Sequence, residues 1–129
     1  MTEEAKKAKI LLVEDDVFMI ELLGGELKNT GIEATIAKTG LEAVKKFTEV
    51  KPDLILLDLM LPDQNGFEAL RQIRRDPAGM AVKVIVLSNL SERSDMEEAK
   101  RLGVLEYLVK AHHSLPEIVE RIQKALRGS

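Results

Sequence analysis

Polar side chains follow four apolar runs of the sequence, at the point where each run ends. In chain order they are Glu14 with Asp15, Asp58, Ser88 and Lys110. A continuous run of four or more apolar residues is typical of a strand that is buried on both faces. In open α/β sheets, ligands bind just beyond the carboxyl ends of the strands. We therefore treat these five side chains as candidates for a single site.

The candidate side chains have a chemistry in common. Carboxylates as close together as Glu14, Asp15 and Asp58 would be repel one another, and they persist only if a cation neutralises them or a proton is shared. Oxygen ligands without His or Cys suit a hard divalent ion, Mg²⁺ first, with Mn²⁺ as a substitute. A carboxylate such as Asp58, beside a metal ion, a lysine and a hydroxyl, is equipped to accept a phosphoryl group as an acyl phosphate.

The surrounding pattern predicts how these residues are brought together. Five strands alternate with five helices, and the strands are expected at 10–13, 32–37, 54–57, 82–87 and 104–109. Right-handed crossovers then give a doubly wound α/β fold, (βα)5 and flavodoxin-like, with a parallel sheet and helices on both faces. The least continuous runs, the second and fifth, belong at the edges, which predicts the strand order 2-1-3-4-5. The switch point lies between strands one and three, where Asp15 and Asp58 end their strands.

Two of the helices carry predictions about their buried face. The residues expected to point inward are Leu41, Val44 and Phe47 on the second helix, and Met96, Ala99 and Leu102 on the fourth. The stripe on the fourth helix is thin, so this helix is expected to be loosely held.

Length and composition favour one globular domain. The chain has 129 residues, 45% of them hydrophobic and 32% charged, with a net charge of −3 and no cysteine. The negative charge argues against nucleic acid or an anionic membrane as partner. Residues 1–8 form a charged extension without the core of a signal peptide, 9–127 form the domain, and 128–129 are interpreted as a candidate cloning remnant. A cytoplasmic location follows as the default expectation.

The chain resembles the receiver domain of response regulators in two-component signalling, from about Lys9 to Leu126. The matching signatures are Leu12-Val13-Glu14-Asp15-Asp16, Asp58-Leu59-Met60-Leu61-Pro62 with Gly66, Ser88, and Tyr107 three residues before Lys110. The resemblance implies that Asp58 is phosphorylated by a histidine kinase or a phosphotransfer protein.

The resemblance also implies a role for each residue around Asp58. It implies that Mg²⁺ is bound by Asp15, Asp58 and the backbone carbonyl of Met60, with Glu14 binding directly or through water. It also implies that Ser88, Lys110 and Asn89 bind the phosphoryl group, and that Tyr107 is the aromatic switch. It implies a stand-alone receiver that catalyses only its own phosphorylation and dephosphorylation. Its output surface, formed by the fourth helix, fifth strand and fifth helix, would bind a downstream protein. The domain is expected to be a monomer or a weak, phosphorylation-dependent dimer.

Two positions depart from the usual pattern of this family. Ala111 replaces the proline that usually follows the lysine, so a cis peptide bond is not expected there. Asn89 replaces a smaller residue, and we expect it to narrow the path by which Tyr107 turns inward. In addition, Met60 and Leu90 flank the approach of water to the phosphoryl group. Neither side chain orients water well, which predicts slow dephosphorylation.

Three alternatives share parts of this pattern. A flavodoxin-like FMN protein needs a hydroxyl- and glycine-rich loop after the first strand, where this chain has three acids. A phosphatase of the haloacid dehalogenase type needs a second aspartate at the position of Met60. The remaining rival is a receiver-like interaction module that works without phosphorylation. Whether the native chain continues into an output domain is left open.

Overall fold

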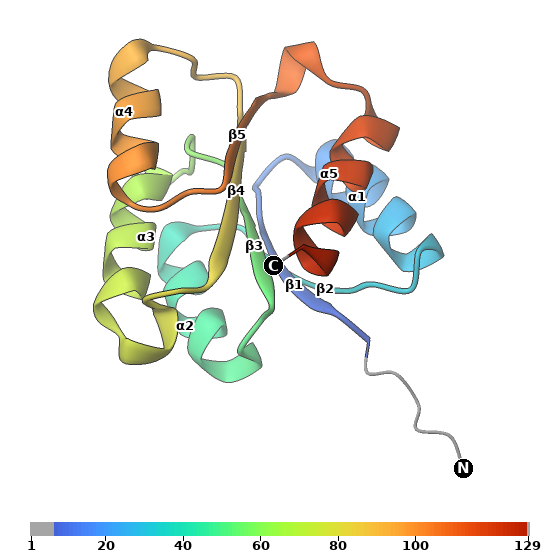
Figure 1. Ribbon diagram of the computed structural model, residues 1–129, viewed down its shortest axis with the longest axis horizontal. Coiled ribbons are helices and arrows are strands. Elements are labelled where there is room, and N and C mark those ends of the chain that lie inside the picture. Colours follow the sequence, from blue (N-terminus) through green and yellow to red (C-terminus); the bar gives the residue numbers. More distant parts are fainter. Residues whose placement is uncertain (1–6, 129) are drawn as a thin grey trace.

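The apolar runs of the sequence form a single parallel sheet in the computed structural model, which describes residues 7–128 (Figure 1). Its strands are β1 (Lys9–Val13), β2 (Glu33–Ala37), β3 (Leu54–Leu57), β4 (Lys83–Ser88) and β5 (Glu106–Val109). They lie in the order β2-β1-β3-β4-β5. The predicted fold class, strand order and edge strands are therefore confirmed.

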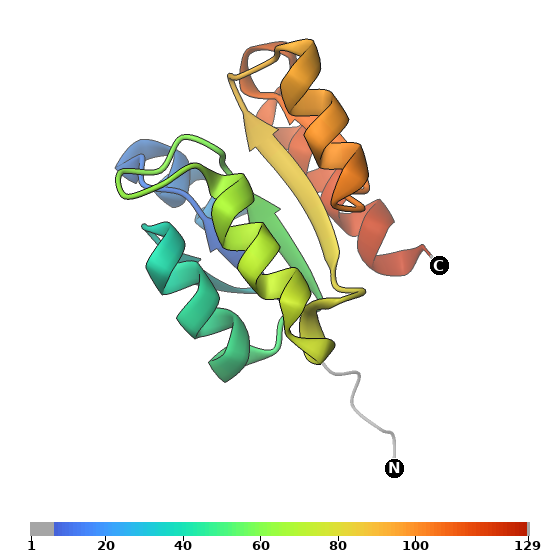
Figure 2. The ribbon, with the colours of Figure 1, turned by 90° about the vertical axis from the view of Figure 1, so that its left-hand side faces the viewer.

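Helices cover both faces of the sheet. They are α1 (Val17–Asn29), α2 (Gly40–Val50), α3 (Gly66–Arg75), α4 (Arg93–Arg101) and α5 (Leu115–Arg127), with short 3₁₀ turns η1 (Pro77–Gly79) and η2 (Lys110–His112). In Figure 1, α1 and α5 lie on one side of the sheet and α2, α3 and α4 on the other, and Figure 2 turns the second group toward the viewer. Within residues 7–128, every helix is too short or too polar to cross a bilayer.

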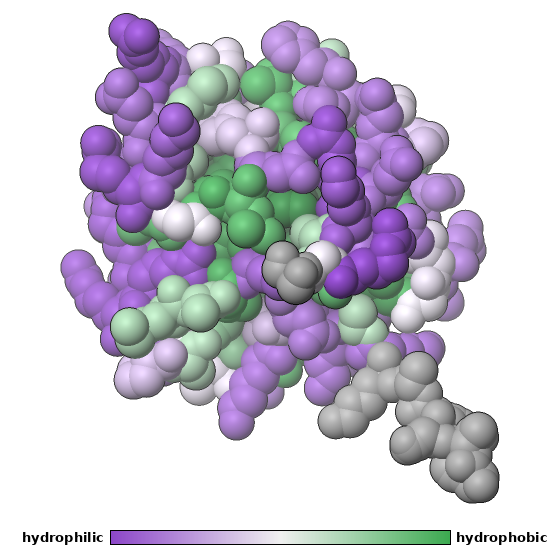
Figure 3. Space-filling view, in the orientation of Figure 1, coloured by the Kyte–Doolittle hydropathy of each residue, from purple (hydrophilic) through white to green (hydrophobic). Residues whose placement is uncertain are grey.

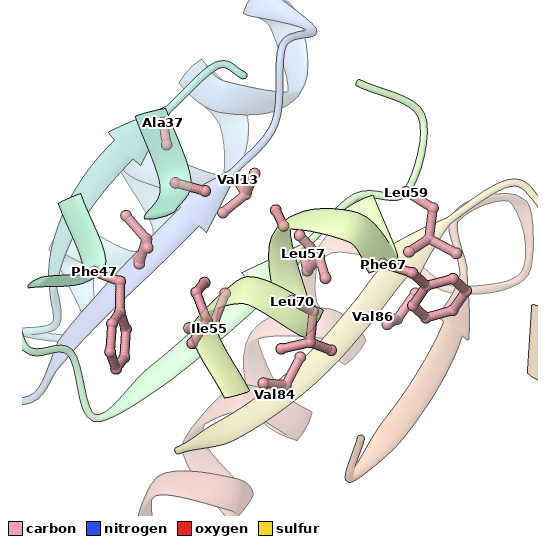
Figure 4. Close-up of a cluster of buried hydrophobic side chains, with 14 of the residues drawn as sticks. Val13, Ala37, Phe47, Ile55, Leu57, Leu59, Phe67, Leu70, Val84 and Val86 are labelled. Atoms are coloured by element: carbon pink, nitrogen blue, oxygen red, sulfur yellow. The ribbon is translucent and has the colours of Figure 1, made fainter. Parts of the chain in front are cut away.

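Each central strand contributes side chains to two hydrophobic clusters, because successive side chains point to opposite faces of the sheet. On β1, Leu11 and Val13 pack under α2 and α3, whereas Ile10 and Leu12 pack under α1 and α5. Figure 4 shows the first cluster, in which Phe67 of α3 lies over the sheet. Burial of a large apolar side chain is worth about 1.5–3 kcal/mol, so the continuous runs are what hold the strands between the helices.

Strands β2 and β5 begin later than predicted. The Ile32 N–H bonds back to the Leu27 carbonyl at the end of α1, and the Val104 N–H bonds back to the Ala99 carbonyl at the end of α4, both at 3.0 Å. Gly31 and Gly103 make these returns with φ of +80° and +72°, a region that favours glycine. The first apolar residues of both runs are thus used to end helices.

Two predictions about buried helix faces are wrong. Leu41 is 71% exposed, because α2 turns Gly40, Ala43 and Phe47 toward the sheet instead. Gly40 is closely packed, since a Cβ there would lie 2.6 Å from the side chain of Gln64. Met96 is also exposed, which leaves Ala99 as the one fully buried residue of α4.

One ion pair between Arg71 and Glu98 attaches α4 to α3, where apolar packing is thin. Glu98 of α4 accepts hydrogen bonds from Arg71 of α3 at 3.0 Å and from Arg101 at 2.7 Å. The two guanidinium groups, Arg101 first, lower the pKa of the Glu98 carboxyl. The predicted weakness of apolar contact at α4 is therefore observed, but charged groups supply part of the attachment.

The ends of the chain are described only in part. Residues 1–6 of the predicted extension and Ser129 lie outside the described residues. The Ala8 carbonyl accepts the Glu33 N–H at 2.9 Å, so residue 8 is bonded to the first residue of β2. Gly128 caps α5 and its carbonyl accepts a bond from Lys83 at 2.8 Å.

Candidate functional site

The acidic side chains meet at the carboxyl ends of β1 and β3, as the topology predicts. Backbone hydrogen bonds hold them there: the Asp58 N–H donates to the Val13 carbonyl at 3.0 Å, and the Glu14 N–H donates to the Ala37 carbonyl at 2.9 Å. Carboxylate oxygens of Glu14, Asp15 and Asp58 all lie within 4.8 Å of one another. Glu14 and Asp58 are buried, whereas Asp15 is exposed.

Lys110 forms ion pairs with both buried carboxylates. Its Nζ lies 2.8 Å from Glu14 Oε1 and 3.0 Å from Asp58 Oδ2. Burial raises the pKa of Glu14, although the bond from Lys110 opposes that shift. Burial by itself would lower the pKa of Lys110, but the bonds to Glu14 and Asp58 outweigh it and the pKa is raised. Lys110 is thus a cation over the whole physiological range, held directly beside Asp58.

The loop after β3 is tightly closed around Asp58. The Met60 N–H donates to Asp58 Oδ1 at 3.1 Å, and Met60 forms an isolated antiparallel bridge with Asn65. A Cβ on Gly66 would lie 2.4 Å from the Asp58 carbonyl oxygen, so only glycine fits there. The Met60 side chain is exposed while its backbone faces this closed loop. The carboxylate therefore has one oxygen bound by the loop and the other by Lys110.

Asp63 anchors the same loop to a neighbouring helix, a contact that the sequence analysis missed. Its carboxylate accepts the N–H groups of Gly40 at 2.8 Å and Leu41 at 3.0 Å, at the start of α2. These backbone bonds, that of Gly40 first, lower the pKa of Asp63. Asp63 lies 23 residues from Gly40 in the sequence, and no local pattern indicates the pairing.

Ser88 and Tyr107 are connected through one residue. Ser88 is buried at the end of β4, and its Oγ accepts the Leu90 N–H at 3.3 Å. The Tyr107 hydroxyl donates to the Leu90 carbonyl at 2.6 Å. Burial, with the charges of Asp95 and Asp58, raises the pKa of Tyr107 to about 12, so this hydroxyl remains a donor. Leu90 itself packs against the core beneath α3 and α4.

Asn89 is directed away from this connection. Its Oδ1 accepts the Ala111 N–H at 3.0 Å. Tyr107 bonds to the Leu90 carbonyl with Asn89 in place, and the effect of Asn89 on an inward turn of Tyr107 stays a prediction. The peptide bond before Ala111 is trans, in line with the replacement of proline.

The donor set at this site suits a hard cation. Three carboxylates offer one oxygen each, and two of them are buried where an unneutralised charge is costly. No histidine or cysteine joins the cluster, which disfavours softer metals. Within residues 7–128 this is the one group of three or more metal-ligating side chains with such close oxygens. The carboxylates present therefore fit Mg²⁺.

Comparisons with known proteins point in the same direction. The family model described as the response regulator receiver domain matches residues 10–123. The chemotaxis protein CheY of Listeria monocytogenes is 36% identical over 121 residues, which cover 92% of this chain and 98% of that protein. A solved receiver domain of sensor histidine kinase PA1611 from Pseudomonas aeruginosa, with a magnesium ion in its active site cleft, has a TM-score of 0.84 and 28% identity, covering 95% of this chain and 100% of that one. The phosphorylated cyanobacterial phytochrome response regulator RcpA has a TM-score of 0.82 and 32% identity, covering 95% of this chain and 96% of that one.

Proposed function

Because this chain belongs to the response regulator receiver domain family, we propose that Asp58 accepts a phosphoryl group from a phosphohistidine and so switches the surface of the domain. The observation that carries the proposal is the environment of Asp58. A buried carboxylate shares one lysine, at 2.8 and 3.0 Å, with a second buried carboxylate, beside an exposed aspartate. In such an arrangement the carboxylates favour a bound cation, and the Lys110 ammonium favours an anionic ligand beside Asp58.

In the proposed transfer, one Asp58 carboxylate oxygen attacks phosphorus. The new O–P bond forms as the bond from phosphorus to the donor imidazole nitrogen breaks, and the imidazole leaves with that electron pair. Glu14, Asp15, Asp58 and the Met60 carbonyl would hold Mg²⁺, which would supply positive charge to the phosphoryl oxygens. The Lys110 ammonium moves its hydrogen bond from the carboxylate to a phosphoryl oxygen, and Ser88 donates its hydroxyl to another.

The donor protein is proposed to dock on α1. Val17, Phe18 and Leu22 are 60%, 76% and 54% exposed, and they follow directly after the acidic residues at the site. Neighbouring large apolar side chains on a soluble protein mark a contact surface more often than chance placement. A histidine kinase or phosphotransfer protein that covers these side chains would bring its phosphohistidine to the carboxyl ends of β1 and β3.

The output is proposed to appear on α4, β5 and α5. When Ser88 shifts toward a phosphoryl group on Asp58, Leu90 moves with it and carries the hydroxyl of Tyr107, which it binds at 2.6 Å. Tyr107 lies on β5, and hydrophobic side chains reach the surface over this strand, between α4 and α5 (Figure 3). The ionic attachment of α4 to α3 lets α4 adjust without opening the core. A downstream protein would read this face.

The phosphorylated state is proposed to be long-lived. Met60 is exposed at the site and Leu90 packs inward, so neither offers a polar group to orient an attacking water. Met60→Asn should therefore speed the decay of phospho-Asp58, and Met60→Asn with Leu90→Glu should speed it further. A parent protein that decays as fast as the double variant would overturn this part of the proposal.

Intact-mass measurement tests phosphorylation directly. The protein is incubated with acetyl phosphate, with and without Mg²⁺, beside the variants Asp58→Asn and Asp53→Asn. We expect one phosphate adduct in the parent and in Asp53→Asn, dependent on Mg²⁺, and none in Asp58→Asn. An unmodified parent under acetyl phosphate and phosphoramidate would instead support a receiver-like module that works without phosphorylation.

A further inference from the structure

Two hydrogen bonds tie the loop after β4 to residues on either side of Lys110. One is the bond from the Tyr107 hydroxyl to the Leu90 carbonyl, at 2.6 Å. The other runs from the Ala111 N–H to Asn89 Oδ1, at 3.0 Å. The first bond involves Tyr107, which precedes Lys110 on β5, and the second involves Ala111, which follows Lys110 and precedes α5. The loop is therefore bonded to the segment that carries Lys110 at two points, the Tyr107 side chain and the Ala111 backbone.

The second bond depends on both residues being what they are. The β4–β5 ladder ends with Ser88 opposite Val109, so the side chain of Asn89 extends the connection beyond the sheet. A proline at position 111 would have no N–H to donate, and a smaller residue at position 89 would have no amide oxygen to accept it. The two positions that depart from the usual family pattern thus meet in one contact.

The segment that follows passes directly into a capped helix. Lys110–His112 form the turn η2, and the His113 N–H returns to the Lys110 carbonyl at 3.5 Å. Ser114 then opens α5 with a capping box, its N–H bonded to Glu117 Oε1 at 2.7 Å. Only two residues, His112 and His113, separate Ala111 from the cap Ser114, so we expect a displacement of Ala111 to reach the start of α5.

We propose that Asn89 is a positioning residue that joins the two loops beside Asp58 into one unit. A movement of Ser88 toward a phosphorylated Asp58 then displaces the 110–114 segment and the start of α5, in parallel with the path through Tyr107. This inference rests on the proposed phosphorylation of Asp58, and it adds a second output path that does not use the aromatic switch.

The contact itself is tested in the unphosphorylated protein by amide–solvent exchange, measured by NMR. Asn89→Ala should speed exchange of the Ala111 amide about 2- to 12-fold, which corresponds to the 0.5–1.5 kcal/mol net worth of a hydrogen bond. The Ser114 amide, which is bonded to Glu117, is the internal control and should not change. Unaltered exchange at Ala111 would overturn the proposal.

The coupling is tested with beryllofluoride and Mg²⁺ as a phosphoryl mimic, by amide chemical shifts in the parent, Asn89→Ala and Tyr107→Phe. The parent should respond at 88–90 and at 111–115. Asn89→Ala should keep the response at 88–90 and lose at least half of it at 111–115, whereas Tyr107→Phe should keep both.

The negative outcomes distinguish a failure of the coupling through Asn89 from a failure of the proposed function. A response at 111–115 that is equal in the parent and Asn89→Ala, or a parent that responds at 88–90 alone, overturns the coupling and leaves the proposed function standing. A parent that shows no response at 88–90 refutes the proposed function, and the coupling falls with it.

Discussion

Removing the ammonium of Lys110 should destabilise the protein in a way that depends on pH. The side chains of Lys110, Glu14 and Asp58 are 15%, 2% and 5% exposed, so the three charges are largely hidden from water. In Lys110→Met the alkyl chain is approximately kept, and two carboxylates stay buried without their cation. Breaking a buried ion pair by removing one partner costs about 3–5 kcal/mol. The partial exposure of Lys110 places the expected loss near the lower limit, about 3 kcal/mol at pH 7.5.

The pH dependence follows from the carboxylate that can take up a proton. Burial already raises the pKa of Glu14 above its ordinary value of 4.5, so its folded form holds a proton more tightly than the unfolded chain and stability falls as pH rises through the folded pKa. Lys110 opposes that shift, and its removal raises this pKa further. The loss in Lys110→Met should therefore be small near pH 4.5 and grow by at most about 1.4 kcal/mol per pH unit.

Urea unfolding followed by circular dichroism at pH 4.5, 6.0 and 7.5 measures the effect. Lys100→Met, at an exposed lysine of α4, is the matched control and should differ from the parent by less than about 0.5 kcal/mol at every pH. Saturating Mg²⁺ should recover part of the loss in Lys110→Met because it replaces the missing positive charge. A loss that is the same at pH 4.5 and pH 7.5 would refute the reasoning from buried charge.

Four further substitutions test local features elsewhere in the fold. Gly24→Ala and Gly25→Ala should each stabilise the protein by about 1 kcal/mol, because these glycines lie inside α1 with nothing within 4 Å of an added Cβ; a lower thermal midpoint in either variant would count against this. Asp63→Ala should cost about 1 kcal/mol by urea unfolding at pH 7, and the difference should shrink as pH falls toward the lowered pKa of Asp63; a loss that does not change on acidification would contradict the capping role. Arg74→Met should cost about 2 kcal/mol, because the guanidinium donates to the carbonyls of Gly79, Val82 and Leu102 at 3.0, 2.7 and 2.9 Å, and an unchanged midpoint would show that water replaces it.

The parts of the structure that the sequence could predict are those set by local pattern. Continuous apolar runs show strands buried on both faces, and an alternating run shows an edge strand. With right-handed crossovers and the common doubly wound arrangement, these runs predicted the sheet order. The convergence of Glu14, Asp15, Asp58 and Lys110 followed in turn, since parallel strands bring their carboxyl ends to one edge of the sheet.

The parts that could not be predicted depend on contacts between distant residues. The rotation of α2 about its own axis decides that Leu41 is exposed. The contacts at the start of α2 come from Asp63 and Gln64, and neither residue is near Leu41 in the sequence. The bonds of Asn89 to Ala111 and of Arg74 to Leu102 join residues 22 and 28 positions apart. Helical periodicity states that a face is buried, but the partner across the interface decides which of two neighbouring residues lies in it.

The central claim, that Asp58 is the phosphoacceptor, is tested most directly by trapping the acyl phosphate. After incubation with acetyl phosphate and Mg²⁺, borohydride reduction converts a phosphorylated aspartate into homoserine, and peptide mass mapping then locates the altered residue. We predict homoserine at position 58 and nowhere else. Homoserine at Asp15, Asp53 or Asp63 with position 58 unmodified, or no homoserine under conditions that reduce a control acyl phosphate, would contradict the account.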